Sequence, residues 1–119
     1  MYHIYDTVKQ VETQREMEEA MKTERGLERK IETVKKKLME LGDMRPGSLT
    51  VQTRKWGGQY YQLSYSHRGK GHTQYVSKEK RKEVERQTAN YKKFRKLTQE
   101  WVEFGMELCN LKTKREVEK

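Results

Sequence analysis

The sequence has few of the residues that build a thick core, because only 32% of its 119 residues are hydrophobic while 38% are charged. A chain with so little apolar surface to bury folds as an elongated structure with a narrow apolar seam, or folds on a partner. Seven Tyr, two Trp and two Phe argue against disorder. We therefore expect an ordered but thin structure, and by length a single domain over residues 1–119.

Cysteine and long apolar runs are almost absent. Cys109 is the only cysteine, which excludes an internal disulfide and a cysteine-cluster zinc site and is typical of a reducing compartment. No apolar run approaches the roughly 20 residues that span a bilayer, and the first ten residues, MYHIYDTVKQ, lack the apolar region of a signal peptide. These absences predict a cytoplasmic protein with no membrane contact.

The single proline, Pro46, follows the first of two long helical patterns. In the N-terminal segment, residues 1–42, the spacing predicts a helix from about Thr7 to Leu41 that ends before Gly42. Its apolar residues recur every three or four positions, which is the a/d seam of a helix that packs along another helix. The seam residues are Leu27, Ile31, Val34 and Leu38.

A second helix is predicted in the C-terminal segment, residues 77–119, with Ser77 as N-cap and Glu79 in the first turn. Its packing positions are Tyr91, Phe94, Trp101 and Leu108. Since neither seam can stay in water, we expect the two helices to form an antiparallel, coiled-coil-like hairpin. One such seam is narrow, so we also expect a homodimer.

The middle segment, residues 43–76, is the one stretch where apolar and polar residues alternate. The alternation predicts three antiparallel strands, Leu49–Lys55, Gln59–Tyr65 and His72–Val76. Gly57 and Gly58 predict a tight first hairpin, and Gly69 and Gly71 predict a longer second loop with a bulge. The fold class expected is therefore α+β, with two long helices flanking a three-stranded antiparallel sheet.

One face of this sheet is expected to rest on the start of the second helix. Tyr61, Leu63 and Tyr65 alternate onto one side of the middle strand, and the opposite side is polar. Leu49 and Val51, with Val76 or Tyr75, would complete the apolar face.

The net charge of +9 is unevenly distributed along the chain. Residues 1–42 hold nine basic and nine acidic residues, whereas residues 43–76 hold five basic residues and the single acid Asp43. Residues 77–119 hold thirteen basic and eight acidic residues. Such an excess favours polyanionic partners, because Lys and Arg displace condensed counterions from phosphate. A solvated basic surface is the alternative.

Basic, aromatic and amide side chains gather on the predicted sheet and its turns. Nucleic-acid surfaces combine cations for phosphate, rings for stacking, and Arg or Gln for base edges. Alternatively, the aromatic residues cap a small core and the cations keep the sheet edges soluble. The candidate nucleic-acid contacts are Arg45, Arg54, Lys55, Trp56, Tyr60, Arg68, Lys70, Lys78 and Arg81.

Catalytic patterns are missing. The sequence has no P-loop, no GxSxG and no HExxH. His67 and His72 are two candidate metal ligands, but two histidines five residues apart are weak evidence for a metal site. We interpret Cys109 as a small apolar residue beside the seam of the second helix. We expect no catalytic residue, no metal site and no cofactor.

The segment from about residue 45 to 102 resembles a family of small, uncharacterised prokaryotic proteins often encoded near transposases. The matching motifs are Gly47-Ser48-Leu49, Tyr60-Tyr61-Gln62-Leu63-Ser64, Tyr75-Val76 and the segment from Arg86 to Phe94. The resemblance implies a mobile-element setting and supplies no established activity. Many members carry a cysteine cluster between the first two strands; here that place holds only KWGGQ, so the metal site it suggests is not expected.

The pattern of three strands followed by a helix is also similar to the arm-site DNA-binding domains of tyrosine-type integrases, whose sheet enters the major groove. Two functions are therefore expected. In the first, the chain is an accessory protein that binds DNA or RNA through its basic sheet. In the second, it is a helical adaptor that docks on a transposase or another nucleic-acid enzyme without touching nucleic acid.

Overall fold

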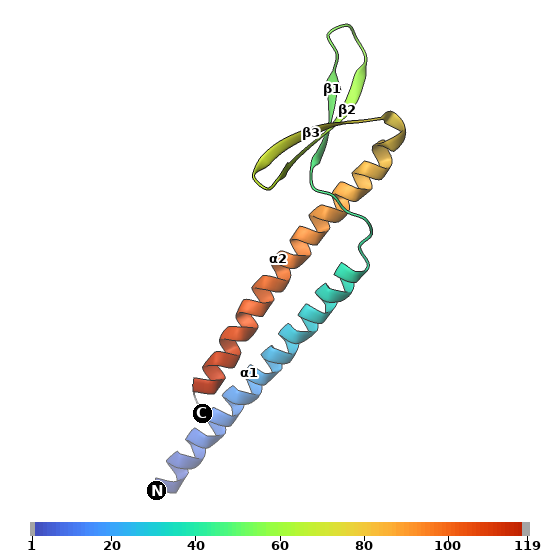
Figure 1. Cartoon of the computed structure of the whole chain (residues 1–119). Helices are drawn as coiled ribbons and strands as arrows, with labels where there is room; N and C mark the ends of the chain where they lie inside the picture. Colours follow the sequence, from blue (N-terminus) through green and yellow to red (C-terminus); the bar gives the residue numbers. More distant parts are fainter. Residues whose placement is uncertain (1, 118–119) are drawn as a thin grey trace. The chain divides into compact units, whose positions relative to one another are not determined.

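The computed structural model describes the backbone of residues 2–117 and the side chains of residues 14–15 and 22–116. Its elements are α1 (Tyr2–Met39), β1 (Ser48–Thr53), β2 (Gln59–His67), β3 (Lys70–Val76), the short 3₁₀ helix η1 (Lys78–Lys80) and α2 (Arg81–Val117) (Figure 1). The three strands form one antiparallel sheet in the order β1-β2-β3. The predicted α+β content, a three-stranded sheet with two helices, is confirmed.

The element boundaries differ from the predicted ones. α1 begins at Tyr2 rather than Thr7, because residues 2–6 contain neither Gly nor Pro to stop the helix. It ends at Met39, and the Leu41 N–H donates to the Leu38 carbonyl in the closing turn. β1 ends at Thr53, two residues earlier than predicted, while β2 and β3 each extend two residues further into their shared turn.

The chain divides into two compact units. Unit 1 holds residues 1–37 and 98–119, and unit 2 holds residues 38–97. The expectation of a single domain stays a prediction. The division separates the predicted seam residues, because Leu38, Tyr91 and Phe94 belong to unit 2 while the other five belong to unit 1.

Unit 1 has a small apolar core between α1 and α2. Leu27, Ile31 and Leu108 are buried together, and Phe104 and Leu111 pack against them. Val34 is buried as well, but Trp101, which was expected to pack in the seam, is 38% exposed. The ammonium of Lys35 lies 5.3 Å from the centroid of the Trp101 ring, so a cation covers part of it.

A buried acid lies in the seam of unit 1. Glu24 is 6% exposed, and its Oε2 accepts a hydrogen bond of 2.7 Å from Arg115. Within the described residues its other oxygen, Oε1, has no hydrogen-bond partner. A carboxylate in such a place is tolerated because the guanidinium offsets its charge.

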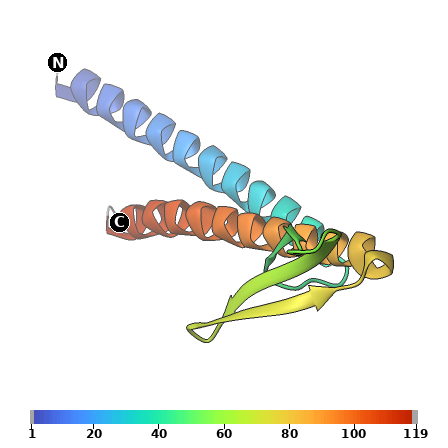
Figure 2. The ribbon, with the colours of Figure 1, turned by 90° about the horizontal axis from the view of Figure 1, so that it is seen from above.

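The core of unit 2 joins the sheet to the first turns of α2, which lie beside the sheet in both views (Figures 1 and 2). Leu63, Val76 and Val84 are buried there, with Leu49, Tyr61 and Tyr65 packed around them. The predicted apolar face is therefore confirmed in Leu49, Leu63, Val76 and the two tyrosines. Val51 is an exception: it lies opposite Tyr61 in the ladder but is 53% exposed, because β1 is an edge strand.

The segment before β1 is tied to α2 by two hydrogen bonds. The Asn90 side chain donates to the Asp43 carbonyl over 2.9 Å, and the Arg45 N–H donates to the Gln87 carbonyl over 3.2 Å. Gly47 then passes so close to β2 that a Cβ would meet the Leu63 side chain at 2.7 Å. These contacts place the start of β1 beside the second and third turns of α2.

Ser77 has the extended backbone of an N-cap, as predicted, and its carbonyl accepts the Lys80 N–H over 3.0 Å. Its hydroxyl makes no capping hydrogen bond, and the chain passes through η1 before α2 begins. Among the described residues no helix is long and apolar enough to cross a membrane.

Candidate nucleic-acid interface

The ladder register sorts the sheet residues into two faces. Residues directly opposite one another share a face, so Leu49, Leu63 and Val76 mark the face that packs on α2. We call the opposite side the outer face. Its residues are Ser48, Thr50, Gln52, Tyr60, Gln62, Ser64, Ser66, Gly71, Thr73 and Tyr75.

Aromatic, cationic and amide groups meet on the outer face near the β1–β2 hairpin. The rings of Tyr60 and Tyr75 are 6.3 Å apart, and the Arg54 guanidinium lies 5.3 Å from the Tyr60 ring centroid. Tyr75 is 61% exposed. The Gln52 amide donates to the Thr50 hydroxyl over 3.1 Å. The outer face therefore offers two rings and polar side chains to a ligand.

The tip of the β1–β2 hairpin projects Lys55 and Trp56. The Gly57 N–H donates to the Arg54 carbonyl and the Arg54 N–H to the Gly58 carbonyl, over 3.1 and 3.0 Å. These two bonds, with φ of 93° at Gly57 and 82° at Gly58, are typical of a three-residue hairpin loop with a bulge, so the predicted tight hairpin is confirmed. Trp56 is 87% exposed at this tip.

The β2–β3 turn lies at the other end of β2. His67 pairs with Lys70, so only Arg68 and Gly69 form the loop, and both have positive φ. This is the pattern of a tight type I′ turn, and the predicted longer loop is wrong. Arg68 is consequently separated from Arg54 by the length of β2, about 27 Å at ~3.4 Å per residue. Lys70 lies on the face that packs on α2.

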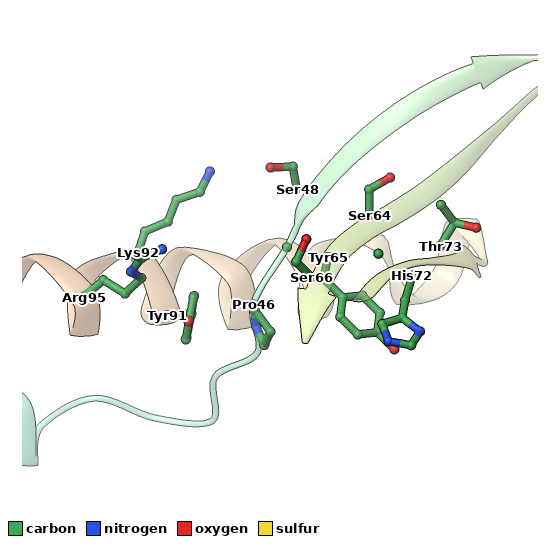
Figure 3. A pocket seen from close by; sticks show the side chains of 12 residues that line it. Pro46, Ser48, Ser64, Tyr65, Ser66, His72, Thr73, Tyr91, Lys92 and Arg95 are labelled. Carbon is green, nitrogen blue, oxygen red and sulfur yellow. The ribbon is translucent and has the colours of Figure 1, made fainter. Parts of the chain in front are cut away.

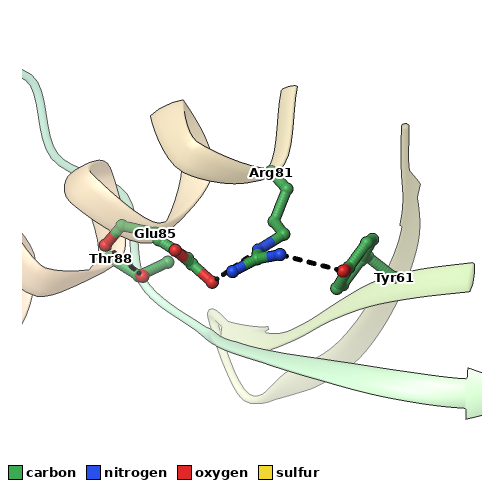
Figure 4. Close-up of polar contacts among 4 residues, drawn as sticks. All are labelled: Tyr61, Arg81, Glu85 and Thr88. Atoms are coloured by element: carbon green, nitrogen blue, oxygen red, sulfur yellow. Dashed lines mark hydrogen bonds and ion pairs between the residues drawn. The ribbon is translucent and has the colours of Figure 1, made fainter. Parts of the chain in front are cut away.

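Arg81 is engaged within the protein (Figure 4). Its Nε donates to Glu85 over 3.0 Å and its Nη1 donates to the Tyr61 hydroxyl over 3.1 Å. The hydrogen bond to Glu85, and then that to Tyr61, raises the pKa of the Arg81 guanidinium. This side chain holds the sheet against α2, which gives it a structural role, and its predicted contact with nucleic acid stays a prediction.

Arg45 and Lys78 lie away from the hairpin tip. Arg45 is half-buried and lines a hollow of about 430 Å³ with Tyr75, Lys80 and Glu83. The acid Glu83 makes this hollow less suited to a phosphate. Lys78 is exposed on η1.

A second hollow opens at the end of the sheet beside Lys92 and Arg95 of α2, and residues of both faces of the sheet line it (Figure 3). This groove measures about 550 Å³. It brings Lys92 and Arg95 of α2 to the same space as Ser48, Ser64 and Ser66 of the sheet. The other lining residues are Pro46, Gly47, Tyr65, Gly71, His72, Thr73 and Tyr91.

Sequence reasoning did not find this groove. Lys92 and Arg95 belong to a basic run, residues 91–96, and such a run by itself is typical of a solvated helix face. The serines carry no signal on their own. Only strand alternation combined with the contact between β1 and α2 could have brought these groups together.

Metal ligands do not converge in the part of the chain whose side chains are described, where no group of three His, Cys, Asp or Glu residues could hold an ion. His72 stacks on Tyr65, with ring centroids 5.0 Å apart. Cys109 is exposed on α2.

Comparison of the chain with family models, with curated proteins and with solved structures finds no match. The resemblance to the transposase-associated family therefore stays a prediction.

Proposed function

We propose that this chain binds nucleic acid through the outer face of its sheet and the β1–β2 hairpin tip. The observation that carries the proposal is the cluster of Arg54, Tyr60 and Tyr75, in which Arg54 and Tyr75 are exposed and Tyr60 is half-buried. This cluster lies in a stretch, residues 44–78, that contains no Asp or Glu to repel phosphate. Cations beside exposed rings match the two parts of a nucleotide, the phosphate and the base.

The proposed role of each residue follows from its position on this surface. Arg54 and Lys55 contact phosphate, and Trp56 and Tyr60 stack on bases. The other basic candidates add weaker phosphate contacts at the edges of the surface: Arg45, Arg68, Lys70 and Lys78.

In this proposal the helices form an antiparallel, coiled-coil-like hairpin and link two copies of the chain. The cross-helix contacts of unit 1 support the antiparallel sense. Glu24 contacts Arg115 and Glu28 contacts Lys112, while Lys35 lies over Trp101, so rising numbers on α1 meet falling numbers on α2. A homodimer would then set the spacing between two sheets.

The proposed setting is that of a cytoplasmic accessory protein of a mobile element, without catalysis or a cofactor of its own. The motif resemblance between residues 45 and 102 supports the setting. The groups that meet on the outer face support binding rather than bond making, since they include no carboxylate and no paired nucleophile and base.

The test is fluorescence anisotropy with labelled oligonucleotides over a range of salt concentrations. The double variant Arg54→Gln/Lys55→Gln is compared with Lys36→Gln/Lys37→Gln, which removes the same charge from exposed positions of α1. Each lost phosphate contact reduces the slope of log affinity against log salt by about 0.7–0.9. We expect a loss of nearly two for the hairpin variant and little change for the control.

Binding without salt dependence would contradict the proposal, as would equal losses in the two double variants. In the second case the net charge alone would explain the binding.

A second candidate function, docking on a protein partner, is favoured by a different observation. α2 leaves Val102 60% exposed and Met106 62% exposed, one turn apart on the same helix face. If the chain is an adaptor, Val102→Lys/Met106→Lys abolishes capture of a transposase or similar enzyme, while the Arg54→Gln/Lys55→Gln variant leaves that capture unchanged.

A further inference from the structure

The outer face presents rings in an arrangement that suits unpaired bases. Tyr60 and Tyr75 come from neighbouring strands, and their rings lie 6.3 Å apart at an interplanar angle of 34°. Gln62 lies directly opposite Tyr75 in the ladder and two residues after Tyr60 on β2, so an amide side chain shares this face with the two rings. Exposed rings on an open sheet are the stacking platform of many proteins that bind single strands.

Beyond Tyr75 the same face continues into the groove. Ser64 pairs with Ser48 on one side and with Thr73 on the other, which gives a row of three hydroxyls. The next row holds Ser66 and Gly71. These side chains are short, and Figure 3 shows Ser48 and Ser64 pointing to one side of the sheet while Tyr65 and His72 point to the other.

α2 supplies the charge at this end. Lys92 and Arg95 line the groove with the serines, and none of its twelve lining residues is acidic. Ammonium, guanidinium and hydroxyl groups are the common phosphate donors of nucleic-acid-binding proteins. A groove of about 550 Å³ lies within the size range of small-ligand sites, roughly 300–1,000 Å³.

The outer face is therefore one continuous track. It runs along alternate residues of β2, from Tyr60 through Gln62 and Ser64 to Ser66. At ~3.4 Å per residue these positions extend over about 20 Å. Cations stand at both ends, Arg54 at the hairpin and Lys92 at the groove.

We propose that the ligand of this track is a single strand of nucleic acid, whose bases stack on Tyr60 and Tyr75 and whose phosphate binds in the groove through Lys92 and the serine hydroxyls. The inference rests on the proposed function and narrows its ligand. A duplex suits the track less well, because its bases are already stacked and exposing one base step costs a few kcal/mol.

The experiment is fluorescence anisotropy of the full chain with a labelled 12-nucleotide single-stranded DNA, the RNA of the same sequence, and the matching DNA duplex. All three are measured at the same salt concentration. We expect at least one of the two single strands to bind tenfold or more tightly than the duplex.

Tyr75→Ala should then weaken single-strand binding about fivefold or more, as loss of one stacked base does.

The groove has a matched pair of test variants. Lys92 lines it and its neighbour Lys93 does not, although both are exposed on α2. We expect Lys92→Gln to weaken single-strand binding about fivefold and Lys93→Gln to weaken it less than twofold. Ser64→Asp, which puts a carboxylate into the groove, should weaken it at least as much as Lys92→Gln. Circular dichroism checks that each variant is folded.

The outcomes separate the two proposals. If the duplex binds as tightly as both single strands, the inference is overturned while nucleic-acid binding stands. If none of the three probes binds, both proposals fail. If Lys92→Gln and Lys93→Gln have equal effects, the placement of phosphate in the groove is wrong.

Discussion

Among single residues, Gly47 has the least room. Its φ is +131°, and a Cβ there would lie 2.7 Å from Leu63 Cδ1 and 2.9 Å from the Ser64 carbonyl oxygen. We expect Gly47→Ala to lower the free energy of unfolding by about 2 kcal/mol or more, since both the backbone and the packing are strained. Urea denaturation followed by tryptophan fluorescence measures the loss.

Gly58→Ala is the control for this variant. Gly58 also has positive φ, +82°, but an added Cβ would meet nothing within 4 Å. The control should lose only the backbone part, about 1 kcal/mol. Equal losses at the two positions would mean that the close approach of Gly47 to β2 has no energetic weight.

Arg68 is the one described non-glycine residue with positive φ, 51°. The turn Arg68–Gly69 has the form that favours Asn-Gly. Arg68→Asn should therefore raise the free energy of unfolding by about 0.5–1 kcal/mol, because Asn tolerates the left-handed conformation better. Thermal unfolding would show a higher Tm. Lys70→Asn removes the same charge from the neighbouring strand and should give no such gain; a gain there too would point to charge rather than turn geometry.

Among the elements, α1 and α2 are joined in unit 1 by the Glu24–Arg115 pair as well as by apolar contacts. Arg115→Ala would leave the buried Glu24 carboxylate without its cation, and we expect a loss of about 1–3 kcal/mol in the free energy of unfolding. Glu24→Leu should cost less, because a buried apolar side chain needs no partner. Denaturation curves of both variants show which substitution lowers the free energy of unfolding more. A larger loss for Glu24→Leu than for Arg115→Ala would contradict this assignment.

The elements also show why the sheet stays on α2. Arg81 joins β2 to the helix through Tyr61 and Glu85, and its hydrogen bond to Glu85, followed by that to Tyr61, raises the pKa of its guanidinium. Thr88, buried one turn later, donates to the Glu85 carbonyl over 3.0 Å. These bonds hold the outer face toward solvent by anchoring the opposite face.

For the whole molecule, the two apolar clusters share no residue, which suggests that the units can open separately. Leu27→Ala leaves a cavity in unit 1, and such changes in a core cost about 2–5 kcal/mol. Hydrogen exchange should then quicken in residues 22–37 and 98–116 while the amides of β2 keep their protection. Val84→Ala should do the reverse. Equal quickening throughout the chain would instead support the single domain that its length predicts.

Much of the architecture could be predicted from local patterns. The seam of Leu27, Ile31 and Leu108, the alternation in Tyr61, Leu63 and Tyr65, and the glycines at both turns indicated helix, strand and turn correctly. Turn types and strand ends were less predictable, because Arg68 at positive φ is tolerated only where the ladder between His67 and Lys70 holds it.

The candidate site could be predicted only in part. Arg54 and Tyr60 were both among the predicted contacts, and the structure brings them together because a hairpin places the end of one strand beside the start of the next. Arg68 and Lys70 were grouped with them by charge, but a turn at the far end of β2 separates them. Lys92 and Lys93 are identical, adjacent residues in the sequence, but only Lys92 lines the groove. A helix turns about 100° per residue, so the packing of the helix determines which of the two faces the sheet.

The chain's composition and periodicity were thus enough to determine that two long helices flank a basic, acid-free sheet, since short-range spacing controls which residues can share a helix stripe or a strand face. Only the tertiary structure determined which cationic side chains lie near which aromatic rings and hydroxyl groups. Some of these residues are as far as 47 positions apart in the sequence, such as Ser48 and Arg95, and their proximity depends on register, turn geometry and the packing of Leu63, Val76 and Val84.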